Sequence, residues 1–180
     1  MNGNDEDGNG GVPWVATGRG QTVALSNTWL GDKSWAKVVA GEKLMEEAIA
    51  VHAATTANGS GGKNDQDDEN QLIQLLLGVL SVDTLPRLEK DKTAGVPVDD
   101  YIAHLQQSIF VPVIGSTNQQ TNQTHEKPHL QGLYGTQKQT VMLVGFDGRV
   151  RYFERTLYED DCSSTKFATR DKSYEFQIEK

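Results

Sequence analysis

Residues 140–156 have the pattern of a β-hairpin, which constrains the fold of the second half of the chain more than any other segment. Both arms consist largely of strand-forming residues, namely Val141, Leu143, Phe146, Val150, Tyr152 and Phe153. Asp147-Gly148 lies between the arms and is a strong signal for a two-residue turn, because both positions can adopt a positive φ. The sequence therefore predicts two antiparallel strands joined at Asp147-Gly148.

Helical patterns precede the hairpin. Residues 34–55 repeat apolar side chains at three- and four-residue spacing, and Ser34 is a suitable N-cap. A second helix is predicted over residues 67–80, and it is apolar nearly all round, so we expect it to be deeply packed. A short helix is predicted over residues 99–109, followed by a brief extended piece over residues 110–114.

Extended segments are predicted at both ends of the chain. Residues 14–25 have the pattern of two short strands joined by a turn at residues 18–20. Residues 173–179 alternate polar with apolar side chains, so one face of this strand is expected to be buried. The apolar positions are Tyr174, Phe176 and Ile178. Strands at both ends with helices between them indicate an α+β fold in which an antiparallel sheet packs against helices.

The chain of 180 residues is long enough for one domain with a hydrophobic core. Residues 1–13 are expected to form a disordered tail, because Gly, Asn and acidic residues dominate them. Low-complexity loops are expected near residues 56–68 and 115–129, where small and polar residues dominate. Residues 14–180 are thus expected to form one domain interrupted by two polar loops.

The formal net charge is −8, and an acidic surface disfavours nucleic acid and anionic membranes as direct partners. Cys162 is the single cysteine, so the sequence excludes an internal disulfide and a cluster of thiolate metal ligands, which fits a reducing compartment. No run of about 18 apolar residues is present, so no transmembrane helix is expected.

Candidate catalytic and metal-binding residues are few, and each has an ordinary structural alternative. Cys162 is internal and follows two aspartates, which disfavour its thiolate, so a plain thiol is expected. His125 and His129 have the HxxxH spacing of metal ligands, but Pro128 lies between them in a polar loop, so no metal site is expected. His104 has apolar neighbours and is expected in the core or at its rim.

Three further polar positions leave alternatives open. Glu154 and Arg155 are adjacent on a strand, so they face opposite sides; one could point inward and mark a site, although a solvated pair is favoured. Ser26-Asn27 is either a polar site at a strand end or turn chemistry before the helix, and the residues favour neither. His52 is expected to cap the negative end of the first helix.

Two groups of motifs occur in order along the chain. The first is Leu25-Ser26-Asn27, Trp35-Ala36-Lys37-Val38 and Gly41; the second is Tyr134-Gly135-Thr136, Thr140-Val141, Asp147-Gly148 and Phe153-Glu154-Arg155, with Tyr174-Glu175-Phe176 at the end. They resemble the LSN … W-x-K-V … G and YGT … T … DG … F-x-E-R segments of the NRDE family, also called the transport and Golgi organisation protein family. These motif positions are the candidate site residues, with no catalytic or metal-binding role assigned to them.

The resemblance covers only the C-terminal part of that family's domain, so it implies a partial αββα sandwich of the N-terminal-nucleophile hydrolase type. Family members begin Met-Cys, and the cysteine becomes the nucleophile; this chain has Asn2 there and lacks the Asn-Arg-Asp-Glu motif. Gln137 stands where the family often has Arg, and Lys138 can replace only part of that charge. The chain is therefore expected to be non-catalytic as it stands.

The resemblance also implies a cytoplasmic, Golgi-associated role in Golgi organisation and secretory transport, exerted by binding a protein or a small hydrophobic ligand. For some relatives it implies haem or lipid handling, which keeps haem open as a cofactor. Two alternatives are a fragment of an N-terminal-nucleophile amidohydrolase with its other half upstream, and a metal or haem carrier using His104, His125 or His129. A half sandwich would expose an apolar sheet face, so self-association or a need for the other half is expected.

Overall fold

The computed structural model describes residues 18–58, 65–87, 98–116, 132–158 and 167–179. Within these ranges the helices are α1 (Ala36–Asn58), α2 (Asp65–Leu80) and the short α3 (Val98–Tyr101), which continues into the 3-10 helix η2 (Ile102–His104). A two-stranded antiparallel sheet contains β1 (Ile114–Ser116) and β2 (Gly132–Tyr134). A three-stranded antiparallel sheet contains β3 (Lys138–Val144), β4 (Arg149–Tyr158) and β5 (Phe167–Gln177) in that order.

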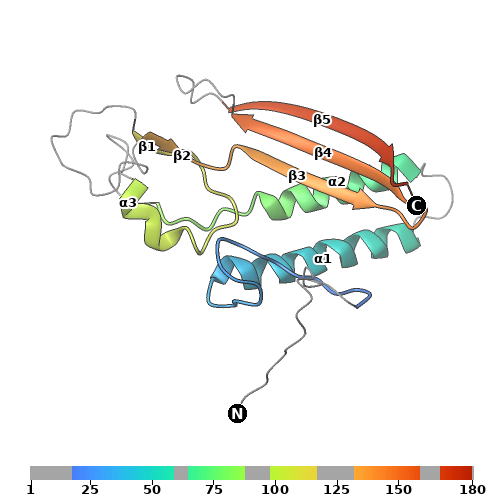
Figure 1. Ribbon diagram of the computed structural model, residues 1–180, viewed down its shortest axis with the longest axis horizontal. Helices are drawn as coiled ribbons and strands as arrows, with labels where there is room; N and C mark the ends of the chain where they lie inside the picture. Colours follow the sequence, from blue (N-terminus) through green and yellow to red (C-terminus); the bar gives the residue numbers. More distant parts are fainter. Residues whose placement is uncertain (1–17, 59–64, 88–97, 117–131, 159–166, 180) are drawn as a thin grey trace, which may run out of the picture.

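The elements form layers on one side of the larger sheet. Figure 1 shows α1 and α2 running in opposite directions, with α2 packed against β3 and α1 packed against α2. The predicted α+β fold with antiparallel sheets and packed helices is confirmed. No helix in the described ranges is long and apolar enough to cross a membrane.

The predicted hairpin is present, but its turn is longer than expected. Strands β3 and β4 pair in the register Val141↔Phe153 and Val144↔Val150. The connection spans residues 145–148, and the Gly148 N–H donates to the Gly145 carbonyl over 3.0 Å. Only glycines have a positive φ among the described residues, and Gly148 has 86°. The prediction of a two-residue Asp-Gly turn was therefore wrong.

The cause lies in Asp147 itself. Its carboxylate oxygen accepts a hydrogen bond from the Arg149 N–H over 3.0 Å, an arrangement that favours a local turn with only the following glycine at positive φ. Phe146 is consequently part of the turn and fully exposed, whereas the sequence placed it on the first arm.

The early strand predicted over residues 22–25 is absent from the described part of the chain, and residues 14–17 lie outside it. The turn at residues 18–20 is present, with Gly20 at a φ of 74°. The extended segment that follows is held by side chains of α1. The Ala24 N–H donates to Glu42 Oε1 over 3.1 Å, and Thr22 Oγ1 donates to Glu46 Oε1 over 2.6 Å. Side chains of α1 therefore accept hydrogen bonds from this segment, whereas the strand pattern predicted a neighbouring strand as its partner.

Both long helices are confirmed with shifted ends. Helix α1 begins at Ala36, and the Ser34 N–H before it donates to Asp32 Oδ1 over 2.8 Å. Helix α2 begins at Asp65, and the carboxylates of its first turn suit the positive end of the helix. The third helical segment ends at His104, so residues 105–109 are not part of it. Of the extended piece predicted over 110–114, only Ile114 belongs to a strand.

The described core consists of two clusters. One side of α2 packs against the face of the three-stranded sheet that is directed towards the helices, here called the inner face. Ile73, Leu77 and Val141 are buried there. The other apolar side chains of α2 are half-buried and several of its polar residues are exposed, so the deep packing expected all round this helix holds for one side only. The second cluster joins α3 to the segments around β1 and contains Leu85, Val98, Tyr101, Val111 and Ile114.

On the opposite side of the three-stranded sheet, here called the outer face, several large apolar side chains are exposed, although Val150 on the central strand β4 is buried. The register aligns Met142, Tyr152 and Tyr174, and likewise Val144, Val150 and Phe176. The exposed large side chains have exposed fractions of 48–59%: Met142, Val144, Tyr174, Phe176 and Ile178. The alternation predicted for the last strand is present in β5, but its apolar side is exposed in the described structure, contrary to the expectation.

Candidate functional site

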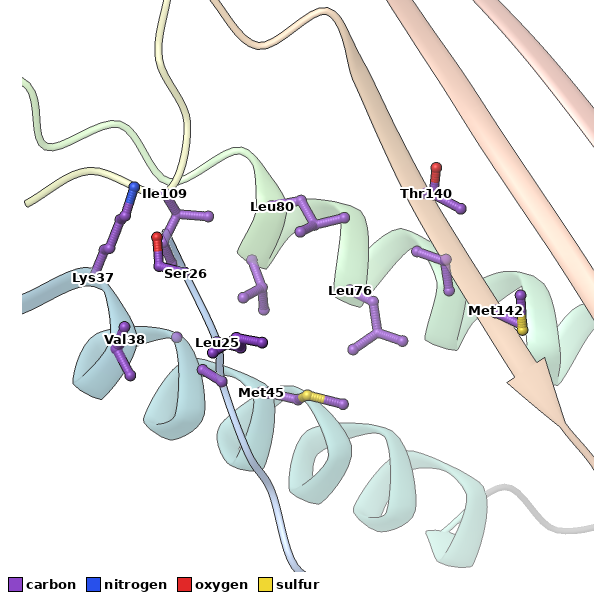
Figure 2. Close-up of a pocket in the computed structure, with 14 residues that line it drawn as sticks. Leu25, Ser26, Lys37, Val38, Met45, Leu76, Leu80, Ile109, Thr140 and Met142 are labelled. Atoms are coloured by element: carbon purple, nitrogen blue, oxygen red, sulfur yellow. The ribbon is translucent and has the colours of Figure 1, made fainter. Parts of the chain in front are cut away.

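A pocket of about 410 Å³ lies between α1, α2, the edge strand β3 and the extended segment before α1. Figure 2 shows its 14 lining residues. The extended segment contributes Ala24, Leu25 and Ser26; α1 contributes Lys37, Val38, Gly41 and Met45; α2 contributes Leu76, Val79 and Leu80; the remainder are Ile109, Thr140, Val141 and Met142. The walls are mainly apolar, which is typical of sites for small hydrophobic molecules.

The pocket exists because the extended segment lies close to α1 without filling the space in front of α2. The segment passes over Gly41 of α1, where a Cβ would lie 3.8 Å from both Ala24 Cβ and Ile109 Cδ1, which is an ordinary contact distance. The Ala24–Glu42 hydrogen bond fixes the segment on α1, and Glu42 also pairs with Lys33. The hydrogen bonds from Lys33 and Ala24 lower the pKa of Glu42 and keep its carboxylate charged.

One end of the pocket is polar. Lys37 and Ser26 lie together at that end in Figure 2, whereas Met45 and Met142 lie at the other. Burial lowers the pKa of the Lys37 ammonium, because the charged form loses hydration. Lys37 Nζ lies 5.1 Å from the centroid of the Trp35 ring, within cation–π range. The site is thus an apolar channel with a cation at one end.

Residues from both groups of motifs meet in this pocket. Leu25, Ser26 and Lys37 come from the first group, and Thr140 comes from β3 in the second. Of the two alternatives for Ser26-Asn27, the structure places Ser26 in the pocket wall and leaves Asn27 exposed. The sequence offered no signal that residue 140 would lie near residue 26.

The Tyr134-Gly135-Thr136 motif has a structural role outside the pocket. The Thr136 N–H donates to the Val111 carbonyl over 2.8 Å, and Thr136 Oγ1 accepts from the Val111 N–H over 2.9 Å. A Cβ on Gly135 would lie only 3.1 Å from Pro112 O and Val113 Cα, so this position needs glycine. The motif therefore holds the chain after β2 against residues 111–113.

Glu154 and Arg155 face opposite sides of the sheet, as predicted, and each pairs with a neighbouring strand. Lys138 Nζ donates to Glu154 Oε1 over 3.1 Å and lowers the pKa of Glu154. Arg155 donates to both carboxylate oxygens of Asp171 over 2.9 Å, a bidentate contact that lowers the pKa of Asp171. Both pairs link adjacent strands, and they form no shared site.

His104 is half-buried, which agrees with its expected place in the core or at its rim, whereas His52 has surroundings other than those expected. His52 lies within α1, which continues to Asn58, and its Nε2 lies 3.2 Å from Asp68 Oδ1 on α2. The cap predicted for it was therefore wrong. His104 is half-buried, and its Nδ1 is buried without a hydrogen-bond partner in the described chain. Cys162, His125 and His129 lie outside the described residues, as does Asn2. The residues that the structure describes include no group of three or more potential metal ligands.

The sequence reasoning missed a charged cluster between α2 and β4. Arg151 is buried, and its guanidinium contacts Glu69 over 3.2 Å and Asn70 over 2.6 Å. Arg149 also pairs with Glu69. These partners are 80 to 82 residues apart in the sequence, so no local pattern could indicate them. The cluster fixes the start of α2 on the sheet.

Comparison with known proteins supports the resemblance in the motifs. The family model described as Transport and Golgi organisation 2 matches residues 4–159. A search of curated proteins finds no match to the chain. The family match extends over the pocket, the hairpin and all the motifs except Tyr174-Glu175-Phe176, and it covers well over half of the sequence. The chain therefore belongs to the Transport and Golgi organisation 2 family.

Proposed function

We propose that this protein is a non-catalytic member of its family that binds a small hydrophobic ligand in the pocket between α1, α2 and β3. The observation that carries the proposal is the apolar pocket of about 410 Å³ in which residues of both motif groups meet. A pocket of this size and lining suits a ligand that must be kept from water. In the cell, such binding would serve Golgi organisation and secretory transport from the cytoplasmic side.

The described residues of the pocket support a binding role over hydrolysis. Within the described chain, Ser26 Oγ makes no hydrogen bond to a base that could activate it. Amide hydrolysis that persists in a Cys162→Ala variant would contradict this part of the proposal, because the single cysteine of the sequence could then not account for it.

Binding of a neutral hydrophobic dye such as Nile red tests the pocket directly. Leu25→Glu places a carboxylate in the pocket wall at a side chain that is 62% exposed, so the fold is expected to tolerate it. We expect dye affinity to fall about tenfold, because an apolar ligand in the pocket would remove water from that carboxylate. Leu30→Glu is the matched control, since Leu30 is 41% exposed and lies outside the pocket.

The exposed outer face is a second surface that could take up the dye, and a further variant separates it from the pocket. Phe176→Lys alters the outer face and leaves the pocket unchanged. The proposal requires that Phe176→Lys retains dye affinity while Leu25→Glu loses it. The reverse result would assign dye binding to the outer face and remove the support for a ligand pocket.

The αββα sandwich expected from the resemblance is also a proposal. Its support is the arrangement of α2 and α1 on one side of the sheet and the exposed apolar side chains of the outer face on the other. In such a sandwich a second sheet covers the outer face, and side chains such as Phe176 and Val144 would pack into it.

A further inference from the structure

The polar end of the pocket holds a cation without a charged partner among the described residues. Lys33 pairs with Glu42, and Lys43 lies 3.7 Å from Glu47. Lys37 Nζ lies over the Trp35 ring, and no carboxylate in the part of the chain that the structure describes pairs with it. Lys37 is also half-buried, unlike Lys33 and Lys43. A cation that has lost part of its hydration gains free energy when an anion approaches it.

The surroundings of Lys37 strengthen its attraction for an anion. Lys37 belongs to the first turn of α1, which contains no acidic residue, so the positive end of the helix is not neutralised. Glu42, the first acidic residue along α1, has its carboxylate occupied by Lys33 and the Ala24 N–H. Ser26 lies at the same end of the pocket and has a hydroxyl that can donate a second hydrogen bond.

The remainder of the pocket suits a flexible hydrocarbon. From Lys37 the lining passes Leu25 and continues to Leu76 and Met45 (Figure 2). Methionine side chains adapt to irregular apolar ligands. The pocket therefore changes from cationic to apolar along its length, which matches a molecule with one charged end.

We propose that the pocket binds an unbranched aliphatic chain that ends in a carboxylate, with the carboxylate on Lys37 Nζ and Ser26 Oγ and the chain between α1 and α2. This inference deepens the proposed function and rests on it. Its distinct content is the role of Lys37, which selects an anionic head over a neutral one of the same length.

Calorimetric titration of the full chain with dodecanoate and with dodecanol separates head from tail. Wild-type protein is expected to bind dodecanoate about tenfold more tightly than dodecanol, because a carboxylate accepts a stronger hydrogen bond from the Lys37 ammonium than a hydroxyl does. Lys37→Gln is expected to abolish that preference, and Lys37→Arg to keep most of it. Lys43→Gln removes the same charge from the exposed side of α1 and should retain the full preference.

The outcomes separate this inference from the proposed function. Equal affinities for dodecanoate and dodecanol in the wild type, unchanged by Lys37→Gln, would overturn the role of Lys37 and leave a purely apolar pocket. Binding of neither compound would overturn both proposals. If Lys43→Gln and Lys37→Gln lose the preference for dodecanoate to the same extent, the preference arises from net charge alone. That result would also overturn the inference. Circular dichroism of each variant confirms that the helices are retained.

Discussion

At the scale of single residues, Thr136 illustrates how a motif position can act through the backbone. Its hydroxyl accepts the hydrogen bond of the Val111 N–H, and Val111 is itself buried. Thr136→Val keeps the shape of the side chain but leaves that N–H without a partner, so we expect the free energy of unfolding to fall by about 1–3 kcal/mol. Urea denaturation followed by circular dichroism measures the change.

Thr140→Val is the matched control for this prediction. Thr140 belongs to the same group of motifs, but its side chain is exposed on β3, so the same substitution should change the stability by less than about 0.5 kcal/mol. Equal effects of the two substitutions would show that the Val111 hydrogen bond contributes nothing specific.

The motif residues could be recognised in the sequence, but their roles could not. Thr136 and Thr140 are four positions apart and looked equivalent, yet one fixes the backbone and the other lines the pocket. The sequence around Lys37 does not indicate that this residue lines a pocket, because the pocket forms only where Ser26 and α2 also lie close by. Contacts between segments that are distant in the sequence depend on how the elements pack, and they cannot be inferred from a single sequence.

At the scale of secondary structure, Gly41 and Gly135 should respond to alanine in opposite directions. A Cβ on Gly41 would make ordinary contacts at 3.8 Å, and glycine inside a helix costs about 0.5–1 kcal/mol relative to alanine, so Gly41→Ala should raise the stability by that amount. A Cβ on Gly135 would press on backbone atoms at 3.1 Å, so Gly135→Ala should lower the stability by about 1–3 kcal/mol. Thermal melting of both variants measures the change in Tm. Changes of the same sign in the two variants would contradict this prediction.

Elements with local causes were predicted, and those with distant causes were not. The helices and the hairpin follow from periodicity and strand propensity, so α1, α2, β3 and β4 were found with small errors at their ends. Residues 22–25 have the composition of a strand, but Glu42 and Glu46 satisfy their polar groups. The longer turn at residues 145–148 arose from the Asp147 carboxylate, which competes with the two-residue turn.

At the scale of the whole molecule, the outer face is the surface through which we expect the protein to self-associate in solution. Five large apolar side chains lie exposed there, and contiguous patches of this kind mark surfaces that associate. Both outer strands of the sheet, β3 and β5, also have an edge without a partner strand in the described structure. We therefore expect the purified protein to self-associate at micromolar concentration.

Sedimentation velocity over a range of concentrations tests this expectation. Phe176→Lys places a charge on the outer face and should shift the distribution towards the monomer, because a desolvated ammonium opposes burial of that face. Ser173→Lys adds the same charge to β5 on the opposite side of the strand and should leave the association unchanged. A wild-type protein that sediments as a monomer at all concentrations and melts cooperatively would show that water tolerates the outer face as it stands.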